Sequence, residues 1–210
     1  MIVKAQVAGI ILEFKSISII IRPLHLEIKR MALEIPDSLL NLEANCGVFA
    51  VWMLLQHHGV HVDMNELIKL CRHDHQDGTF TIALAVALKK FGFDVSFYTD
   101  PDPYIDDSER LIYQQAQALN IPILSALTYS EIQGAIENGQ MAIVSYDTLD
   151  GVGNQSLVYS MDEQEICFFD SFDPMPAFLF EQQRDAEGIC RQVILINDQE
   201  LKLMQSTKFS

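Results

Sequence analysis

The chain has 210 residues, of which 49 % are hydrophobic and 20 % are charged, so it is expected to fold around a sizeable core and not to be disordered. The formal net charge is −15, and a surface this acidic repels nucleic acid phosphates and anionic membranes. We therefore expect neither nucleic acid nor membrane as a partner. No glycine-rich phosphate-binding loop is present, and no cofactor is expected.

The four cysteines, Cys46, Cys71, Cys167 and Cys190, are widely spaced and form no CxxC pair. This pattern, in a chain rich in apolar residues, argues against a disulfide scaffold and indicates a reducing, cytoplasmic compartment. Charged residues interrupt the apolar stretches near the N-terminus, so neither a membrane helix nor a signal peptide is expected there.

The first thirty residues differ from the remainder, because basic residues outnumber acidic ones only there. The β-branched run Ile17–Ile21 predicts a strand. Residues 1–30 are either an upstream extension or a β-hairpin packed on the domain formed by residues 31–210. The sequence leaves both alternatives open.

Helices are expected first and strands second along the rest of the chain. Hydrophobic periodicity and glycine stops predict helices from Cys46 to before Gly59, from Asp63 towards Cys71, and over 80–91, 107–119 and 130–137. Apolar runs predict strands at 93–98, 141–146, 156–160, 166–169, 177–180 and 192–196. This order predicts an α+β fold with an N-terminal helical lobe packed on a mostly antiparallel sheet.

Cys46 stands where the first strong helix is expected to begin. A thiol at a helix N-terminus lies near free backbone N–H groups and the positive end of the helix dipole, which favour the thiolate and lower its pKa. The same N–H groups can hold an oxyanion, and Gly47 leaves room for a substrate backbone. A structural cysteine is the commoner alternative at such a position.

The segment Asn45-Cys46-Gly47-Val48-Phe49-Ala50-Val51-Trp52-Met53 resembles the catalytic-cysteine helix of the C39-like cysteine peptidases. Further similar segments follow in order, at Asp77-Gly78-Thr79, over 137–144, at Phe168-Phe169-Asp170 and at Phe172-Asp173-Pro174. The resemblance spans about residues 36 to 197. It implies a papain-like fold, a peptide or protein as substrate or ligand, Cys46 as nucleophile and Asp170 as the acid that orients the base.

The chain departs from the family pattern at the general base. The family would place a histidine at about Gln155, but all six histidines precede residue 76. An amide cannot replace the histidine, because it has no usable proton affinity near neutral pH. The oxyanion position is also altered, since Leu40 stands where related enzymes place a glutamine; Asn41 is the substitute donor, with Asn45 and Gly47 as the other expected oxyanion or substrate-binding residues.

Other groups of residues fit a functional site less well. His57 and His58 lie about 16–18 Å along the helix from Cys46, too far for a hydrogen bond, whereas His25 would require a permuted arrangement. The cluster Cys71, His73, His75 and Asp77 lacks the second ligand pair of a structural zinc site, and the acidic loop from Asp100 to Asp107 lacks the pattern of a calcium loop. No metal is expected.

Two hypotheses about function follow. The first is a C39-like cysteine peptidase that acts on a peptide or amide bond through Cys46, with Gln155 in the general-base position and Asp170 as the acid. The second is a catalytically inactive module of papain-like fold that binds peptides or proteins. The missing downstream histidine favours the second hypothesis, whereas the retained Cys46-Gly47 pair and Asp170 favour the first. The sequence does not indicate an oligomeric state.

Overall fold

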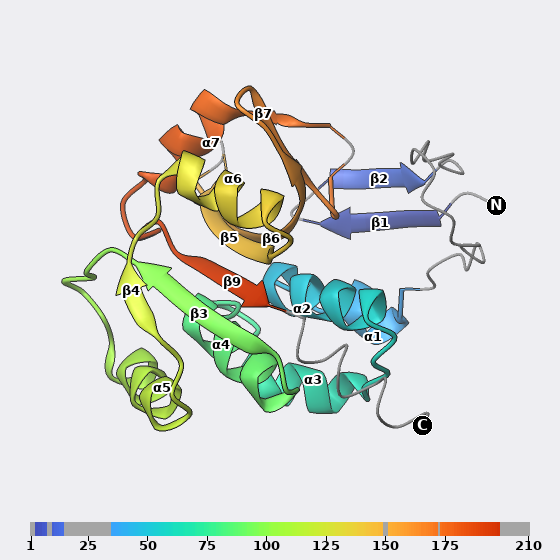
Figure 1. The fold of residues 1–210 in the computed structure, drawn as a ribbon. Coiled ribbons are helices and arrows are strands. Elements are labelled where there is room, and N and C mark those ends of the chain that lie inside the picture. Colours follow the sequence, from blue (N-terminus) through green and yellow to red (C-terminus); the bar gives the residue numbers. More distant parts are fainter. Residues whose placement is uncertain (1–2, 8–9, 15–34, 149–150, 172, 198–210) are drawn as a thin grey trace, which may run out of the picture.

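The computed structural model describes residues 3–7, 10–14, 35–148, 151–171 and 173–197. Strands β1 (Val3–Val7) and β2 (Ile10–Phe14) pair with each other in antiparallel register, from Val3 opposite Phe14 to Val7 opposite Ile10. They form a two-stranded sheet separate from the main sheet (Figure 1). The strand expected at Ile17–Ile21 lies outside the described residues.

The main sheet has seven strands in the spatial order β4-β3-β9-β5-β6-β7-β8. Only β3 and β4 run parallel; every other neighbouring pair is antiparallel. The strands are β3 (Asp94–Thr99), β4 (Ile123–Ser125), β5 (Met141–Asp147), β6 (Gly153–Met161), β7 (Glu165–Phe168), β8 (Met175–Pro176) and β9 (Val193–Asn197). The mostly antiparallel sheet expected from the sequence is confirmed.

Seven helices accompany the sheet in the described part of the chain, and they cover both of its faces (Figure 1). They are α1 (Asp37–Leu40), α2 (Cys46–His57), α3 (Met64–Leu70), α4 (Thr81–Lys90), α5 (Asp107–Ala118), α6 (Tyr129–Glu137) and α7 (Ala177–Arg184). The α+β fold class with an N-terminal helical lobe is therefore confirmed.

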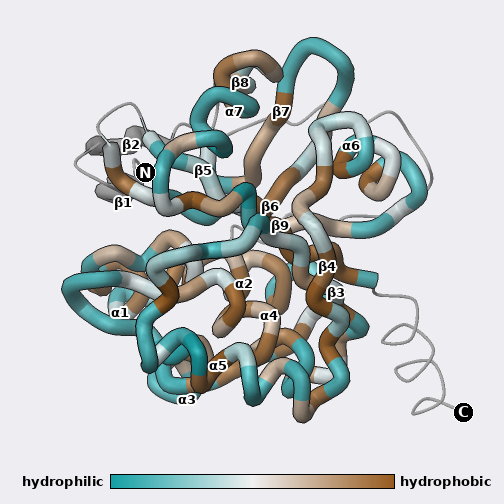
Figure 2. Tube along the Cα trace, turned by 90° about the vertical axis from the view of Figure 1, so that its left-hand side faces the viewer, coloured by the Kyte–Doolittle hydropathy of each residue, from teal (hydrophilic) through white to brown (hydrophobic). Residues whose placement is uncertain are grey.

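Each face of the sheet has its own hydrophobic core because side chains alternate along a strand. Ile143, Leu157 and Ile194 point to the face where α2, α3, α4 and α5 pack. Their neighbours Val144, Val158 and Val193 point to the opposite face, where α6 and α7 pack. Figure 2 shows the hydrophobic stretches gathered where helices and strands meet, with hydrophilic loops around them.

The helix boundaries follow the signals in the sequence. The Asp63 side chain accepts a hydrogen bond from the Glu66 backbone N–H at 3.1 Å, which caps the start of α3 as expected. Gly59 and Gly92, which follow α2 and α4, have φ angles of +66° and +92°. Glycine adopts this left-handed conformation without strain, so it ends a helix readily.

The strand predicted at 177–180 is wrong, because these residues begin α7. The extended Pro176 precedes the helix, and only Phe180 of the apolar run is fully buried, while Phe178 remains exposed. Arg184, at the end of α7, is also fully buried. Its guanidinium pairs with Glu181 at 2.8 Å, donates to the Leu127 and Arg191 carbonyls, and lies over the Phe180 ring.

Candidate functional site

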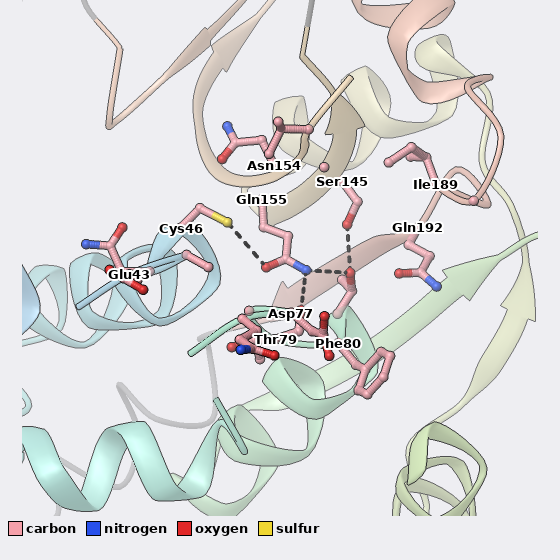
Figure 3. A pocket seen from close by; sticks show the side chains of 18 of the residues that line it. Glu43, Cys46, Asp77, Thr79, Phe80, Ser145, Asn154, Gln155, Ile189 and Gln192 are labelled. Atoms are coloured by element: carbon pink, nitrogen blue, oxygen red, sulfur yellow. Dashed lines mark hydrogen bonds between the residues drawn. The ribbon is translucent and has the colours of Figure 1, made fainter. Parts of the chain in front are cut away.

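Cys46 is the first residue of α2, and its thiol faces the side chain of Gln155 on β6 (Figure 3). The Sγ atom donates a hydrogen bond to the Gln155 amide oxygen, Oε1, at 3.8 Å. Packing of α2 against β6 brings together two residues that are 109 positions apart. The structure thus places the two residues expected at the nucleophile and general-base positions next to each other.

A polar network fixes the orientation of the Gln155 amide. Its Nε2 donates to the Thr79 carbonyl oxygen at 2.7 Å and to the Thr81 hydroxyl at 3.0 Å. The Thr81 hydroxyl in turn pairs with the Ser145 hydroxyl at 2.8 Å. Because a backbone carbonyl only accepts hydrogen bonds, the NH₂ group must face Thr79, and Oε1 is left to face the thiol. The thiol therefore meets an acceptor that has no usable basicity.

Gly47 provides the space that this arrangement needs. A β-carbon at position 47 would collide with Oε1 of Gln155 and would lie 3.0 Å from a methyl group of Leu84. The absence of a side chain thus lets Gln155 approach the start of α2. The sequence suggested that Gly47 admits a substrate backbone, whereas in the structure the neighbour in this space is Gln155.

The expectation of a lowered thiol pKa is wrong. Burial raises the pKa of Cys46 above its ordinary value, and the nearby carboxylate of Asp170 acts in the same direction. The backbone N–H of Gln155 on β6 favours the thiolate, and so does that of Gly47, as expected at a helix N-terminus, but burial outweighs both. The resting form of the site is consequently a protonated thiol.

Asp170 lies close enough to influence Cys46, but its hydrogen-bond partner is Ser156. The Ser156 hydroxyl donates to Oδ2 of Asp170 at 2.8 Å, and Ser156 also pairs with the Tyr146 hydroxyl at 3.1 Å. Burial raises the pKa of Asp170 to about 6. Gln155 and Ser156 are successive residues of β6, so their side chains point to opposite faces of the strand. No hydrogen bond joins Asp170 to Gln155 among the described residues.

The two asparagines expected near the oxyanion position direct their amides elsewhere. The Asn41 amide donates to the Asp37 carbonyl at 2.8 Å, where it closes the short helix α1. The Asn45 amide, which is buried, donates to the Leu39 carbonyl at 2.7 Å. Both side chains thus stabilise the chain that leads into α2. The N–H donors close to the thiol belong to the backbone of Gln155, Gly47 and Cys46.

The described histidines take no part in the hydrogen bonds of Cys46 and Gln155. His57 and His58 stand at the far end of α2, and Nδ1 of His73 pairs with the Thr79 hydroxyl at 3.1 Å. His25 falls outside the described residues. In the described part of the chain, no histidine lines the cavity that surrounds Cys46.

This cavity has a volume of about 830 Å³ and lies at the N-terminal end of α2. Its walls come from four separate stretches of chain, with described lining residues at 40–46, 76–81, 102–109 and 188–192, and from β5 and β6 at the base. Figure 3 shows Cys46, Gln155 and Ser145 facing the space between these walls. Its size falls within the range of ligand-binding pockets.

Two further expectations concern metals and membranes. In the ranges that the structure describes, no group of three or more His, Cys, Asp or Glu side chains could hold a metal ion. Cys71, which the zinc alternative would require, is fully buried. None of the described helices is both long enough and apolar enough to cross a membrane.

One comparison, with models of protein families, bears on the resemblance seen in the sequence. Residues 38–110, which contain Cys46 and α2, match the family model of the peptidase C39 family. The predicted resemblance to this family is confirmed.

One solved structure similar to this chain is the peptidase domain of Streptococcus ComA, a bi-functional ABC transporter involved in quorum sensing. It shares 16 % sequence identity with this chain, with a TM-score of 0.45. The alignment covers 72 % of this chain and 90 % of that domain. No curated protein matches the chain.

Proposed function

We propose that the protein is a C39-like module that binds peptides in the cavity at Cys46 and does not cleave them. The observation that carries this proposal is the partner of the thiol. Cys46 donates its hydrogen bond to the amide oxygen of Gln155. The hydrogen bonds from the Gln155 NH₂ group to Thr79 and Thr81 keep the amide in this orientation, with its oxygen towards the thiol.

Cleavage through Cys46 would require the thiol to lose its proton to a nearby base. Gln155 cannot accept that proton, and among the described residues no hydrogen bond joins the thiol to the carboxylate of Asp170. Burial also raises the pKa of the thiol, so that the thiolate fraction at neutral pH is small. These three features together favour the inactive module over the peptidase.

Peptide binding is supported by what the site retains. The match to the C39 family covers the helix that carries Cys46. The cavity next to that helix has about 830 Å³ of space and a lining of backbone, amide and hydroxyl groups that can pair with a peptide backbone. A cavity that keeps these groups can bind a peptide without a proton shuttle.

The test combines cleavage and binding by the full chain. Wild-type protein and the Cys46→Ala variant are incubated with a pool of random decapeptides, and fragments are identified by mass spectrometry. The two proteins are expected to give the same fragment pattern. The same pool, added to ¹⁵N-labelled protein, is expected to shift the amide signals of cavity residues such as Thr79 and Gln155.

Fragments that form with the wild type and are absent with Cys46→Ala would instead establish the peptidase hypothesis. If the pool leaves the cavity signals unmoved, the binding hypothesis is wrong.

A further inference from the structure

The cavity at Cys46 is lined by carboxylates on more than one wall. Glu43 belongs to the loop before α2, Asp77 to the turn before α4, and Asp102, Asp106 and Glu109 to the loop and helix that begin α5. No lysine, arginine or histidine is found among the described residues that line the cavity. The acidic groups therefore face a common space from segments that are far apart in the sequence.

The protein's own cations do not neutralise these carboxylates. Arg110 and Arg191 pair with other acids, since Arg110 lies 3.7 Å from Asp107, and Arg191 holds Asp100 through two hydrogen bonds of 2.6 and 3.0 Å. Arg72 donates to the amide oxygen of Gln115 at 2.8 Å. Among the ion pairs formed between described residues, none involves a carboxylate that lines the cavity.

Glu109 provides a second, independent observation. Its side chain lines the cavity although only 6 % of the residue is exposed. No hydrogen bond or ion pair connects its carboxylate to another described residue, and a buried charge without a partner is costly. Burial, together with the negative charges of Asp102 and Asp106, raises the pKa of Glu109 to about 7. A cation bound in the cavity would supply the missing partner.

We propose that the cavity selects basic peptides, with a lysine or arginine side chain of the ligand bound among the carboxylates of Glu43, Asp77, Asp102 and Glu109. This inference rests on the proposed function and names the chemical class of its ligand. The carboxylates give the ligand's ammonium or guanidinium group charge-assisted hydrogen bonds. The ligand's backbone would pair with backbone groups that line the cavity, because the Gln155 amide and the Thr81 and Ser145 hydroxyls already bond to one another.

The remaining lining residues fit a long basic side chain. Tyr104 lines the cavity and is 82 % exposed, so its ring is free to stack on a cation. Phe80, Val152 and Ile189 offer apolar surface to the aliphatic part of the side chain. A metal ion would make no contact with the apolar surface or the Tyr104 ring, whereas a lysine or arginine side chain would contact the carboxylates and these apolar groups together.

The test compares two peptides that differ only in charge. The heptapeptide Gly-Ala-Arg-Ala-Arg-Ala-Gly, blocked at both ends, and its analogue with citrulline in place of both arginines are titrated separately into ¹⁵N-labelled full chain. The arginine peptide is expected to shift the signals of cavity residues and to bind about tenfold more tightly than the citrulline peptide, because hydrogen bonds to charged groups are the stronger ones. It is also expected to lower the pKa of Glu109, followed by carboxyl ¹³C signals.

Matched variants separate the cavity from the acidic surface as a whole. Glu43→Gln with Glu109→Gln removes two charges from the cavity, and Glu137→Gln with Glu163→Gln removes two exposed charges elsewhere. The first pair is expected to weaken the arginine peptide about tenfold. The second pair is expected to change binding less than twofold, and the circular dichroism spectra of both should match the wild type.

Equal binding of the two peptides, or equal weakening by the two pairs of variants, overturns the inference. In either case the decapeptide pool can still shift the cavity signals, and the proposed function then stands without a charge preference. If neither the pool nor the heptapeptides move these signals, both proposals are wrong.

Discussion

The Ser156 hydroxyl donates a hydrogen bond to Asp170 at 2.8 Å, which ties the acid to the residue next to Gln155 and not to Gln155 itself. Alternation along β6 turns the two neighbouring side chains to opposite faces of the strand. A base placed at position 155 would therefore lack the orienting acid that a cysteine–histidine pair ordinarily uses.

The Gln155→His substitution tests how far the base alone restores the site. An imidazole next to Sγ should stabilise the thiolate, so we expect iodoacetamide to modify Cys46 at pH 7 at least about tenfold faster than in the wild type. Modification is followed by mass spectrometry of the peptide that contains Cys46. Cleavage of the decapeptide pool should remain absent, because loss of the orienting acid costs about 10⁴-fold in a related triad.

Gln155→Leu is the control for this experiment, because it removes the amide without supplying a base. It should leave the modification rate of Cys46 close to that of the wild type. Equal acceleration by the leucine and histidine variants would mean that access to the thiol, and not its ionisation, limits the reaction.

Gly47→Ala is expected to destabilise the protein by about 1–3 kcal/mol, because its β-carbon collides with the Gln155 amide. Alanine favours a helix over glycine by about 1 kcal/mol, so the loss would come from the collision alone. Urea denaturation measures the free energy of unfolding. In a Gln155→Ala background the same substitution should cost much less, and the double-mutant cycle should show coupling. Additive effects would contradict the contact between the two residues.

Asp170 gives the stability a defined pH dependence. Its pKa is raised to about 6 in the folded protein, above the value of about 4 expected when unfolded. The folded state then holds the proton more tightly, so this residue makes the free energy of unfolding fall as the pH rises from 4 to above 6. Asp170→Asn should reduce the fall between pH 4 and pH 8 by about 1–3 kcal/mol, measured by urea denaturation at both pH values.

The asparagine itself changes the free energy of unfolding by the same amount at both pH values. Comparing the two pH values therefore cancels that change and leaves only the effect of titration. Ser156→Ala provides a second check, since removing the hydrogen bond should raise the pKa of Asp170 further and steepen the fall. An unchanged slope in both variants would show that Asp170 is not the titrating group.

Arg184→Lys should destabilise the protein by about 3–5 kcal/mol, which is the range for breaking a buried charge network. Lysine lacks the planar fork with which Arg184 reaches Glu181, Leu127 and Arg191 at once. Thermal unfolding measures the loss. Arg110→Lys, at an exposed ion pair with Asp107, is the matched control and should change stability by less than about 1 kcal/mol. Similar losses in both variants would contradict the role of burial.

Local signals in the sequence were sufficient for the elements that they specify. The cap at Asp63 and the glycines that end α2 and α4 act within one helical turn, and the structure confirms these boundaries. The run from Ala177 to Phe180 was misassigned because four apolar residues fit a strand and a helix equally well. The polar second half of α7 gave no periodic signal.

In the site too, the sequence predicts residues that belong to local motifs and does not predict contacts between distant segments. Cys46 was recognisable from its position at a helix start, and Gln155 from the family resemblance. The sequence does not reveal the polar network of Thr79, Thr81 and Ser145, nor the acidic lining of the cavity. The residues of both come from segments that meet only in the folded chain. From the sequence, the acidic loop that contains Asp102 is considered only as a calcium loop, and its pattern does not fit one. In the structure it forms a wall of the cavity.

The position of β9 has a consequence for how the protein is made. β9 is the last strand of the described residues, yet it lies between β3 and β5 in the middle of the sheet. Until Val193–Asn197 is available, the helical lobe with β3 and the half that contains β5 and β6 have no strand to join them. During synthesis the main sheet therefore cannot close across its centre until this strand has left the ribosome, although α2 can already pack against β6, so we expect the two halves to lock together cooperatively.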